Sequence, residues 1–379
     1  MNRILCFLLL TTCSAHICLA AEPSAEQINA IFSSVTSNAE PGLAVVVRKD
    51  GRTAFERGYG MRDLRSSLPV DVHTNFRLAS FSKQFTATAI MLLVHDGKLR
   101  YDERITDIFP EFPAYGKEIT VRTLLNHTSG LHDYEDLMMK KYSGQPWQSI
   151  PQIDDEGVLD LLEQESDTKF PPGSKWEYCN GGYEVLANVV RKVSGQPFRD
   201  FLRDRIFIPL RMNSTIVYQY GKNQIADRAY GYTNDNGVWL ETDQSPTSAT
   251  LGDGAVYSSV DDLIKWDDAL RSHTLLSAEE FRPAVMPVQM PENTGISAGT
   301  HPGYGFGWFL DAYNGQPRMW HTGGTIGFQT VIERFPEQEL TIVVLANRTD
   351  VNPKRLADKV ADLYFPRQTS TTGAGSATR

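Results

Sequence analysis

The sequence predicts an α/β (α+β) fold in which strands from both ends of the chain form one antiparallel sheet flanked by helices, with a mainly helical domain inserted between them. Short segments typical of strands and bounded by turn residues lie near both ends, whereas apolar residues recur at helical spacing through the middle. Short strands joined by turn sequences favour antiparallel pairing, and 379 residues are enough for two packed units. We therefore expect a sheet domain of residues 22–78 and 302–367 around a helical domain of residues 79–301.

The sheet is expected to begin after a helix at residues 25–35. Its first two strands are predicted at 42–48 and 52–58, joined by the turn sequence of residues 49–51. Near the other end, four strands are expected at 304–310, 318–321, 328–334 and 340–346, followed by an amphipathic helix at 353–364. Strands so far apart in sequence can share one sheet only if the intervening chain returns to where it left.

The inserted segment is expected to be helical because its apolar residues follow the helical period between recognisable caps. Thr120 and Ser259 suit the start of a helix, and Gly195 suits the end of one. The helices are predicted at 121–126, 156–165, 183–193, 198–207 and 260–271. Loops at 131–144 and 242–253 are expected to shape any pocket beside them.

Residues 1–20 are predicted to be a cleaved secretory signal peptide, because Arg3 precedes an apolar core that ends in small residues. Polar residues interrupt that core and leave it short of the ~20 residues of a membrane span, which makes a membrane anchor the weaker alternative. A lipoprotein signal ending at Cys13 matches poorly. Residues 368–379 are rich in Ser, Thr and Gly and are expected to be disordered. We therefore expect a periplasmic or secreted protein with no stable membrane span after cleavage.

Charge and cysteine content argue against several classes of function. The formal net charge is -9, and loss of residues 1–20 removes one basic residue, leaving 36 basic against 46 acidic residues, or -10. This balance argues against nucleic acid or anionic lipid as a partner. Cys179 would be the single cysteine of the mature chain, so no internal disulfide can form, and no His or Cys spacing suits a metal. We expect no metal and no cofactor. The acidic run at residues 154–156 is interpreted as the start of a helix.

The most informative short motif is Ser-x-x-Lys, with Ser80 and Lys83 at its ends. No Gly or Pro follows before Gly97, so Ser80 is expected in the first turn of a helix with a buried face. Residues three apart project from the same helix face, which places the amine of Lys83 beside the hydroxyl of Ser80 as its local base. Residues 166–169 match the same pattern but run into the breaker sequence 170–173, and are interpreted as a loop.

Two further motifs follow in order, Tyr-x-Asn at residues 178–180 and His-Thr-Gly at residues 321–323. Rival matches at 232–234 and 301–303 lie in turn sequences. Residues 295–299 match the Gly-x-Ser-x-Gly nucleophile elbow, but that motif needs a strand before it and a helix after it, and both flanks here are loop sequences. The first three motifs are therefore preferred.

These three motifs, in this order, resemble the serine β-lactamase and penicillin-binding superfamily, specifically the branch of class C β-lactamases, D-alanyl-D-alanine carboxypeptidases and related esterases. Other segments that look like this family extend the likeness over nearly all the mature chain, at 124–131, 209–212, 304–308 and 345–347. The resemblance implies a serine hydrolase.

The resemblance also implies a role for each matched residue. Ser80 would be the nucleophile, Lys83 its general base or proton relay, and Tyr178 the phenol that handles protons at the leaving group and the attacking water. Asn180 would hold the substrate amide, and the N–H groups of Ser80 and Gly324 would form an oxyanion hole. The substrate-binding residues would then be Asn180, His321, Thr322, Gly323 and Gly324.

Two details bear on the substrate and point in different directions. The segment from Asn352 resembles an element near the carboxylate site of class C β-lactamases, which would bring Asn352 and Arg355 to a substrate anion. The same residues also suit an ordinary helix start, with Asn at the N-cap and Pro next. His321 stands where most β-lactamases of the superfamily have lysine, and histidine is mostly neutral at pH 7. This shifts the expected substrate toward peptides and esters.

The chemistry sets one physical requirement. To act as a base near neutral pH, Lys83 must have a pKa below its ordinary value of ~10.4, through burial or a nearby cation. With that, the sequence predicts an exported serine hydrolase that forms an acyl-enzyme with a small amide, lactam or ester, the favoured substrate being a D-amino-acid peptide or ester. The alternatives are a true class C-like β-lactamase and a non-catalytic interaction protein of penicillin-binding fold.

Overall fold

A computed structural model describes residues 22–35, 37–288 and 303–366. The predictions of a signal peptide at 1–20, a rival nucleophile at 295–299 and a disordered tail at 368–379 lie outside the described residues. His301 lies outside them as well.

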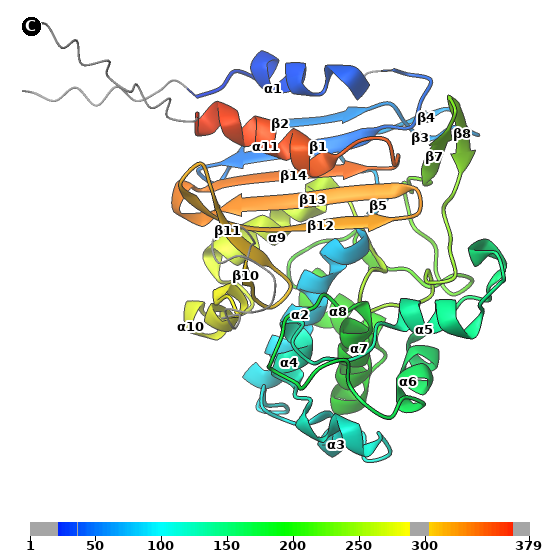
Figure 1. The fold of residues 1–379 in the computed structure, drawn as a ribbon. Helices are drawn as coiled ribbons and strands as arrows, with labels where there is room; N and C mark the ends of the chain where they lie inside the picture. The colour runs from blue at the N-terminus through cyan, green and yellow to red at the C-terminus, as the bar shows by residue number, and fades with distance from the viewer. Residues whose placement is uncertain (1–21, 36, 289–302, 367–379) are drawn as a thin grey trace, which may run out of the picture.

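Strands from the two ends of the chain lie side by side in one antiparallel sheet (Figure 1). β1 (Leu43–Lys49) lies between β2 (Arg52–Tyr59) and β14 (Leu340–Ala346), with Leu43 opposite Ala346. From β14 the sheet continues through β13 (Phe328–Phe335), β12 (Gln316–Thr325), β11 (Phe309–Tyr313) and β10 (Gly303–Tyr304). The predicted fold class, an antiparallel sheet of N- and C-terminal strands flanked by helices, is confirmed.

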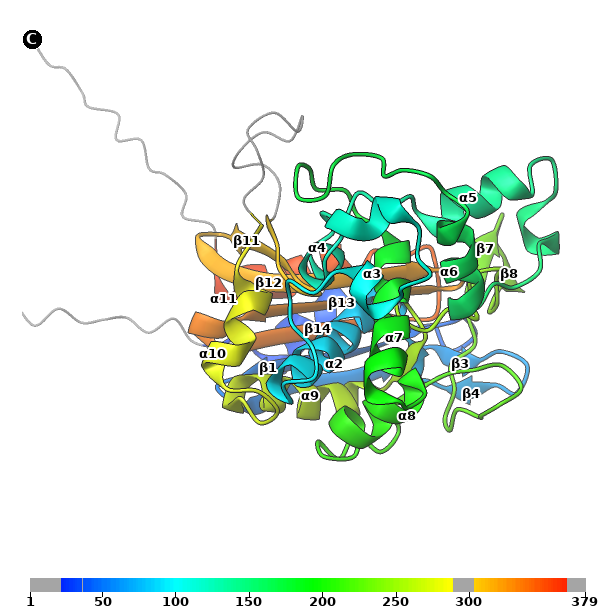
Figure 2. The ribbon, with the colours of Figure 1, turned by 90° about the horizontal axis from the view of Figure 1, so that it is seen from below.

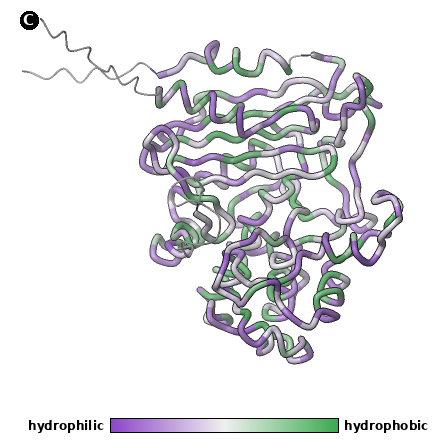
Figure 3. Tube along the Cα trace, viewed as in Figure 1, coloured by the Kyte–Doolittle hydropathy of each residue, from purple (hydrophilic) through white to green (hydrophobic). Residues whose placement is uncertain are grey.

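The two faces of the sheet are covered by different helices (Figure 1). Val47 packs in the core beneath α1 (Ala25–Ile31) and α11 (Pro353–Tyr364), whereas Val46 belongs to the core on the other face, where α9 (Val260–Ser272) packs. Hydrophobic residues recur along these central strands (Figure 3). Alternation along a strand thus buries both faces, because successive side chains point to opposite sides.

The helical part lies on the α9 side of the sheet (Figures 1 and 2). At its centre α2 (Lys83–His95) packs against α7 (Asn180–Ser194), which ends at Gly195 with φ +72°. The other helices of the described residues are α3 (Ile105–Ile108), α4 (Val121–Leu125), α5 (Tyr134–Lys141), α6 (Asp155–Glu163), α8 (Phe198–Leu202), continued by a π-helical turn over Arg203–Phe207, and α10 (Ala278–Phe281). α9 belongs to the segment 79–301 yet packs against β1 and β14, and the division of the chain into two domains stays a prediction.

The single strand expected at 304–310 is wrong, because the chain turns within it. β10 ends at Tyr304 and β11 begins at Phe309. Gly307 between them has φ +77°, a conformation that favours glycine. The hairpin formed by this turn is what brings β10 back to the edge of the sheet.

Shorter strands complete the described structure. Residues 235–237 span the turn of a two-stranded hairpin. The remaining strands are β3 (Met61–Asp63), β4 (Leu68–Pro69), β5 (Phe76–Arg77), β6 (Ile216–Val217), β7 (Tyr232–Asp235), β8 (Val238–Glu241) and β9 (Val256–Ser258). β5, β9 and β6 pair in a three-stranded sheet that the sequence did not reveal. Over the described ranges, every helix is too short or too polar to cross a membrane.

Candidate active site

Ser80 lies in a 3₁₀ turn, Ala79–Ser82, that leads directly into α2. It was expected within the α-helix itself, which begins at Lys83 instead. Thr330 of β13 fixes the turn, because its hydroxyl donates to the carbonyl oxygen of Leu78 at 2.8 Å. Ala79 has φ +50°, a left-handed conformation that costs a residue with a Cβ roughly 1 kcal/mol. Packing against the sheet therefore holds local strain beside the proposed nucleophile.

Lys83 is fully buried, at 0% exposure, and its amine donates three hydrogen bonds. The acceptors are Oγ of Ser80 at 3.1 Å, Oδ1 of Asn180 at 2.9 Å and the backbone oxygen of Asp253 at 3.1 Å. A protonated lysine has three N–H groups, so every donor has a partner. The structure thus brings Lys83 to Ser80, as their spacing predicted, and also to Asn180, whose place in the site was implied by the family resemblance.

The pKa of Lys83 stands above its ordinary value. Burial alone lowers this pKa, but the negative charges that Tyr178, Asp253 and Glu184 can carry raise it by more. The expectation of a lowered pKa is therefore wrong for the resting site, because it considered burial and cations but not carboxyl groups from distant parts of the chain. Lys83 is a cation here, and it can act as a base only after losing a proton.

Helix α5 lies in the segment 131–144, where only a loop was expected. Asp133 caps this helix by accepting from the N–H of Glu135 at 3.0 Å. The other carboxylate oxygen of Asp133 accepts from the N–H of Asn180 at 2.6 Å. One side chain therefore both starts α5 and ties that start to the residue that contacts Lys83.

Four carboxyl groups gather around Lys83, and we call them the acid cluster: Asp133, Glu135, Glu184 and Asp253. Glu184 accepts from the N–H of Asp253 at 2.6 Å, which holds the carbonyl that binds Lys83. Burial, together with Asp133 and Asp253, raises the pKa of Glu135 to about 7. Burial and the neighbouring Asp253 also raise the pKa of Glu184 well above its ordinary value. The cluster therefore holds protons at neutral pH that surface carboxyl groups would release.

Six rings form an aromatic cluster beside Lys83, with neighbouring centroids 4.3 to 6.5 Å apart: His127, Trp176, Tyr178, Tyr304, Phe309 and His321. The amine of Lys83 lies 5.0 Å from the centroid of Tyr178. The phenolic oxygen of Tyr178 is buried and has no hydrogen-bond partner in the described part of the chain. A buried hydroxyl without a partner costs about 1–3 kcal/mol, so this one is set up to bond to something that enters the site.

His321 is held as a neutral imidazole. Its Nδ1 lies 2.5 Å from the backbone oxygen of Thr322, which can only accept, so Nδ1 carries the proton. Its Nε2 then accepts from the hydroxyl of Tyr304 at 3.1 Å. Burial and the charge of Lys83 lower the pKa of His321 to about 3. The prediction that His321 is neutral at pH 7 is confirmed.

Positions 323 and 324 differ in how strictly they require glycine. A Cβ on Gly323 would lie 2.0 Å from the backbone oxygen of Leu78, so only glycine lets β12 approach the Ser80 turn. A Cβ on Gly324 would lie 3.3 Å from the flexible side chain of Gln329, a contact that could relax. Packing therefore explains the first glycine, whereas the second is exposed. The oxyanion hole formed by Ser80 and Gly324 stays a prediction.

Asn352 and Arg355 lie on α11, the helix that covers the other face of the sheet from α9. Oδ1 of Asn352 accepts from the N–H of Arg355 at 3.0 Å, and both residues are exposed. The structure thus shows the helix-start role of Asn352. A substrate-binding role for these two residues stays a prediction.

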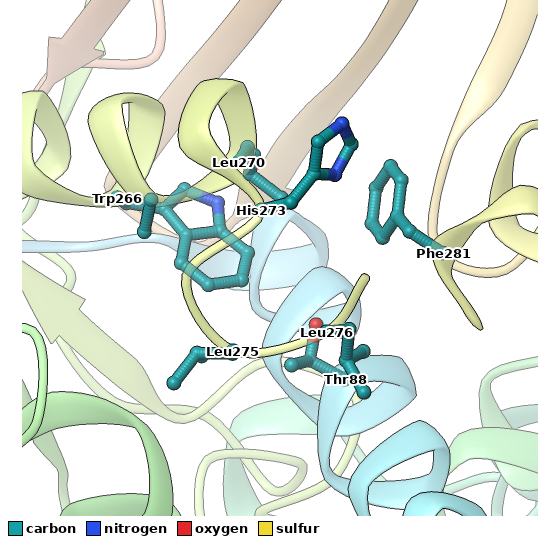
Figure 4. Close-up of a pocket in the computed structure, with 8 residues that line it drawn as sticks. Thr88, Trp266, Leu270, His273, Leu275, Leu276 and Phe281 are labelled. Atoms are coloured by element: carbon teal, nitrogen blue, oxygen red, sulfur yellow. The ribbon is translucent and has the colours of Figure 1, made fainter. Parts of the chain in front are cut away.

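Of the rival motifs that the structure describes, Ser166 lies in a loop as predicted, whereas residues 232–234 form a strand and not the predicted turn. Ser166 is exposed in a loop, and residues 232–234 belong to the β7–β8 hairpin. Cys179 is 5% exposed, and burial raises the pKa of its thiol, so it is a buried structural residue. A small apolar pocket between α2, α9 and α10 contains none of the motif residues (Figure 4). Its one titratable lining residue is His273, at the exposed end of α9.

Sequence reasoning assigned no chemistry to several residues at the centre of the site. They are His127, Asp133, Glu135, Glu184, Asp253 and Tyr304. His127 and Tyr304 lie in the family-like segments 124–131 and 304–308, which was the one signal available for them. The carboxyl groups carry no such mark, because helix packing alone brings them to Lys83.

The model of the family described as Beta-lactamase matches residues 28–365, so the chain belongs to the beta-lactamase family. A penicillin-binding protein of Bacillus subtilis is 31% identical over 86% of this chain and 72% of its own length. A D-aminopeptidase of Cereibacter sphaeroides is 28% identical over 81% of this chain, and the match spans only 57% of that relative.

Solved structures agree with this assignment. The octameric penicillin-binding protein homologue from Pyrococcus abyssi is 25% identical, with a TM-score of 0.76 over 89% of this chain and 76% of that chain. A D-amino acid amidase from Ochrobactrum anthropi, complexed with L-phenylalanine amide, is 27% identical, with a TM-score of 0.74 over 89% of this chain and 97% of its own. The superfamily inferred from the motifs is confirmed, and the chain is a serine hydrolase of the β-lactamase fold.

Proposed function

We propose that this protein is an exported hydrolase that cleaves amides or short peptides of D-amino acids with a free α-amino group, through an acyl-enzyme on Ser80. The observation that carries this proposal is the charge around Lys83, where carboxyl groups gather and His321 is neutral. The D-aminopeptidase and D-amino acid amidase relatives support the substrate class. Export, to the periplasm or the medium, rests on the leader sequence of residues 1–20.

The charges favour a substrate ammonium over a substrate carboxylate. A carboxypeptidase substrate or a β-lactam brings a carboxylate, and that group would meet a neutral His321 and the acid cluster. The cation Lys83 is already occupied by three acceptors. An α-ammonium group instead finds complementary charge at Glu135 and Asp133. These carboxyl groups attract a substrate ammonium and repel a substrate carboxylate, and both effects contribute to specificity. These contacts separate an aminopeptidase or amidase from a β-lactamase.

The proposed reaction uses Lys83 and Tyr178 as one pair that shares protons. Lys83 first releases one proton to solvent, so that the pair can accept another. Ser80 then attacks the substrate carbonyl while its hydroxyl proton passes to this pair, and the oxyanion is held by the N–H groups of Ser80 and Gly324. The phenol of Tyr178 then gives a proton to the leaving amine. A water enters, loses its proton to the same pair and attacks the ester. The pair then returns that proton to the oxygen of Ser80 as the D-amino acid is released. The unpartnered phenol oxygen beside Lys83 is the feature that suits this double use.

A substrate panel on the purified protein tests the proposal. We expect D-alaninamide and D-phenylalaninamide to be hydrolysed at least about tenfold faster than their L-enantiomers, their N-acetyl forms and nitrocefin. A fluorophosphonate probe should label the wild type and the Ser166→Ala control, but not Ser80→Ala. Faster turnover of nitrocefin than of any amide would favour the β-lactamase alternative. Absence of both labelling and turnover would favour a non-catalytic interaction protein.

A further inference from the structure

His127 lies in the family-like segment 124–131, to which sequence reasoning gave no chemical role. It follows α4 with φ +61°, a left-handed conformation that is uncommon for a residue other than glycine. Its side chain is 1% exposed, so this conformation is held in the interior next to the site. A strained, buried histidine beside a catalytic centre is a reason to ask what it holds in place.

His127 binds the backbone on both sides of Tyr178. The carbonyl oxygen of His127 accepts from the N–H of Glu177 at 3.0 Å. Its Nδ1 accepts from the N–H of Cys179 at 3.2 Å. One residue thus fixes the two amides that flank the phenol.

The imidazole also packs on the phenol itself. Its centroid lies 4.3 Å from that of Tyr178, and it is enclosed by Tyr304 at 4.6 Å and Tyr183 at 5.1 Å. Because Nδ1 accepts, the ring must be neutral with its proton on Nε2. Burial, with the charge of Lys83, holds the pKa of His127 well below its ordinary value, in agreement with a neutral ring.

The hydroxyl of Tyr178 makes no hydrogen bond of ordinary geometry in the described part of the chain, and Lys83, which is near enough to interact with it, already donates to three other acceptors. Its place beside Lys83 therefore depends on its backbone and on the rings that touch it. We propose that His127 is a positioning residue for Tyr178, which holds the phenol at the distance from Lys83 that proton transfer requires. This inference rests on the proposed function, because Tyr178 must take part in catalysis for its position to matter.

Two variants of His127 test the inference on a D-amino acid amide. Ala removes the acceptor and the ring, and we expect kcat to fall by about 10²-fold with KM changed by less than about threefold, since a displaced catalytic group slows the chemical step more than binding. Asn places Oδ1 where Nδ1 was and tolerates positive φ, so His127→Asn should recover at least about tenfold in kcat over His127→Ala. A split between kcat and KM is not expected from a residue that merely supports the fold.

His273→Asn is the matched control, because His273 has φ +53° but lies at the exposed end of α9 beside the apolar pocket (Figure 4). It should leave both kinetic constants unchanged. A folded His127→Ala with wild-type kcat, or a His127→Asn no faster than His127→Ala, would overturn the inference. If His127→Ala does not fold, His127→Gln is compared with His127→Asn instead. The longer Gln side chain moves the acceptor away from the N–H of Cys179. Equal kcat for the Asn and Gln variants would overturn the inference. Inactive wild type would instead refute the proposed function.

Discussion

Two clusters meet at Lys83, and they control different properties of the site. The aromatic cluster carries no charge at neutral pH at either of its histidines, and it packs ring against ring around Tyr178. The acid cluster holds carboxyl groups that share protons at neutral pH, and the charges that Asp253 and Glu184 can carry raise the pKa of Lys83. The difference indicates that the rings set where the proton-transfer groups stand, whereas the carboxyl groups set how many protons they hold.

The largest effect is expected from removing Lys83, the residue at which the two clusters meet. Lys83→Ala leaves Ser80 without its neighbouring proton acceptor and leaves the acid cluster without its cation. Loss of a general base costs 10²–10⁴-fold, so we expect fluorophosphonate labelling of Ser80 to slow by at least about 10³-fold. Thermal melting followed by circular dichroism would show whether the variant remains folded.

Lys169→Ala provides the control for this experiment, because it removes the lysine of the rival Ser-x-x-Lys match. Lys169 forms an exposed ion pair with Glu177, and such pairs contribute at most about 1 kcal/mol. Labelling at the wild-type rate is expected. A folded Lys83→Ala that is labelled as fast as Lys169→Ala would remove Lys83 from the mechanism.

The contrast between the clusters also explains what the sequence could predict. β1 and β14 follow from short apolar runs bounded by turn residues, and Lys83 follows from its spacing to Ser80, because neighbours along one element are fixed by local geometry. Glu184 and Asp253 are 69 positions apart and meet only through packing. No local pattern marks such a contact, so the rise in the pKa of Lys83 could not be predicted.

The next effect concerns substrate binding by the acid cluster. Glu135→Gln is expected to raise KM for D-alaninamide by roughly fivefold at pH 7, equivalent to about 1 kcal/mol. Because the pKa of Glu135 is raised to about 7, its charge appears only as the pH rises toward and above that value. At pH 5.5 Glu135 is already protonated, so the variant and the wild type should have equal KM. The substrate amine, with a pKa of ~7.7, stays largely charged over this range.

Asp136→Asn removes the neighbouring exposed acid on the same helix and should leave KM unchanged at both pH values. An N-acetylated substrate, which has no ammonium group, should bind equally well to the wild type and to Glu135→Gln. A KM for D-alaninamide that does not respond to Glu135→Gln at pH 7 would contradict the role given to the acid cluster, while the proton-transfer role of Lys83 would be unaffected.

The last effect is on stability and not on catalysis, at the outer edge of the acid cluster. Asp155 accepts from the N–H of Leu251 at 2.7 Å, and burial, with like charge from Asp253, raises its pKa. A carboxyl group with a raised folded pKa favours the fold in acid, and that contribution is lost as the pH rises from the unfolded pKa through the folded one. Asparagine keeps an acceptor for Leu251 and cannot ionise. The free energy of unfolding of Asp155→Asn, relative to that of the wild type, should therefore be about 1 kcal/mol higher at pH 8 than at pH 4. Urea denaturation at both pH values measures this difference.

Glu156→Gln, which removes the next acid of the same helix turn, should show no comparable gain in stability. An equal gain would assign the effect to the helix start instead of the buried cluster.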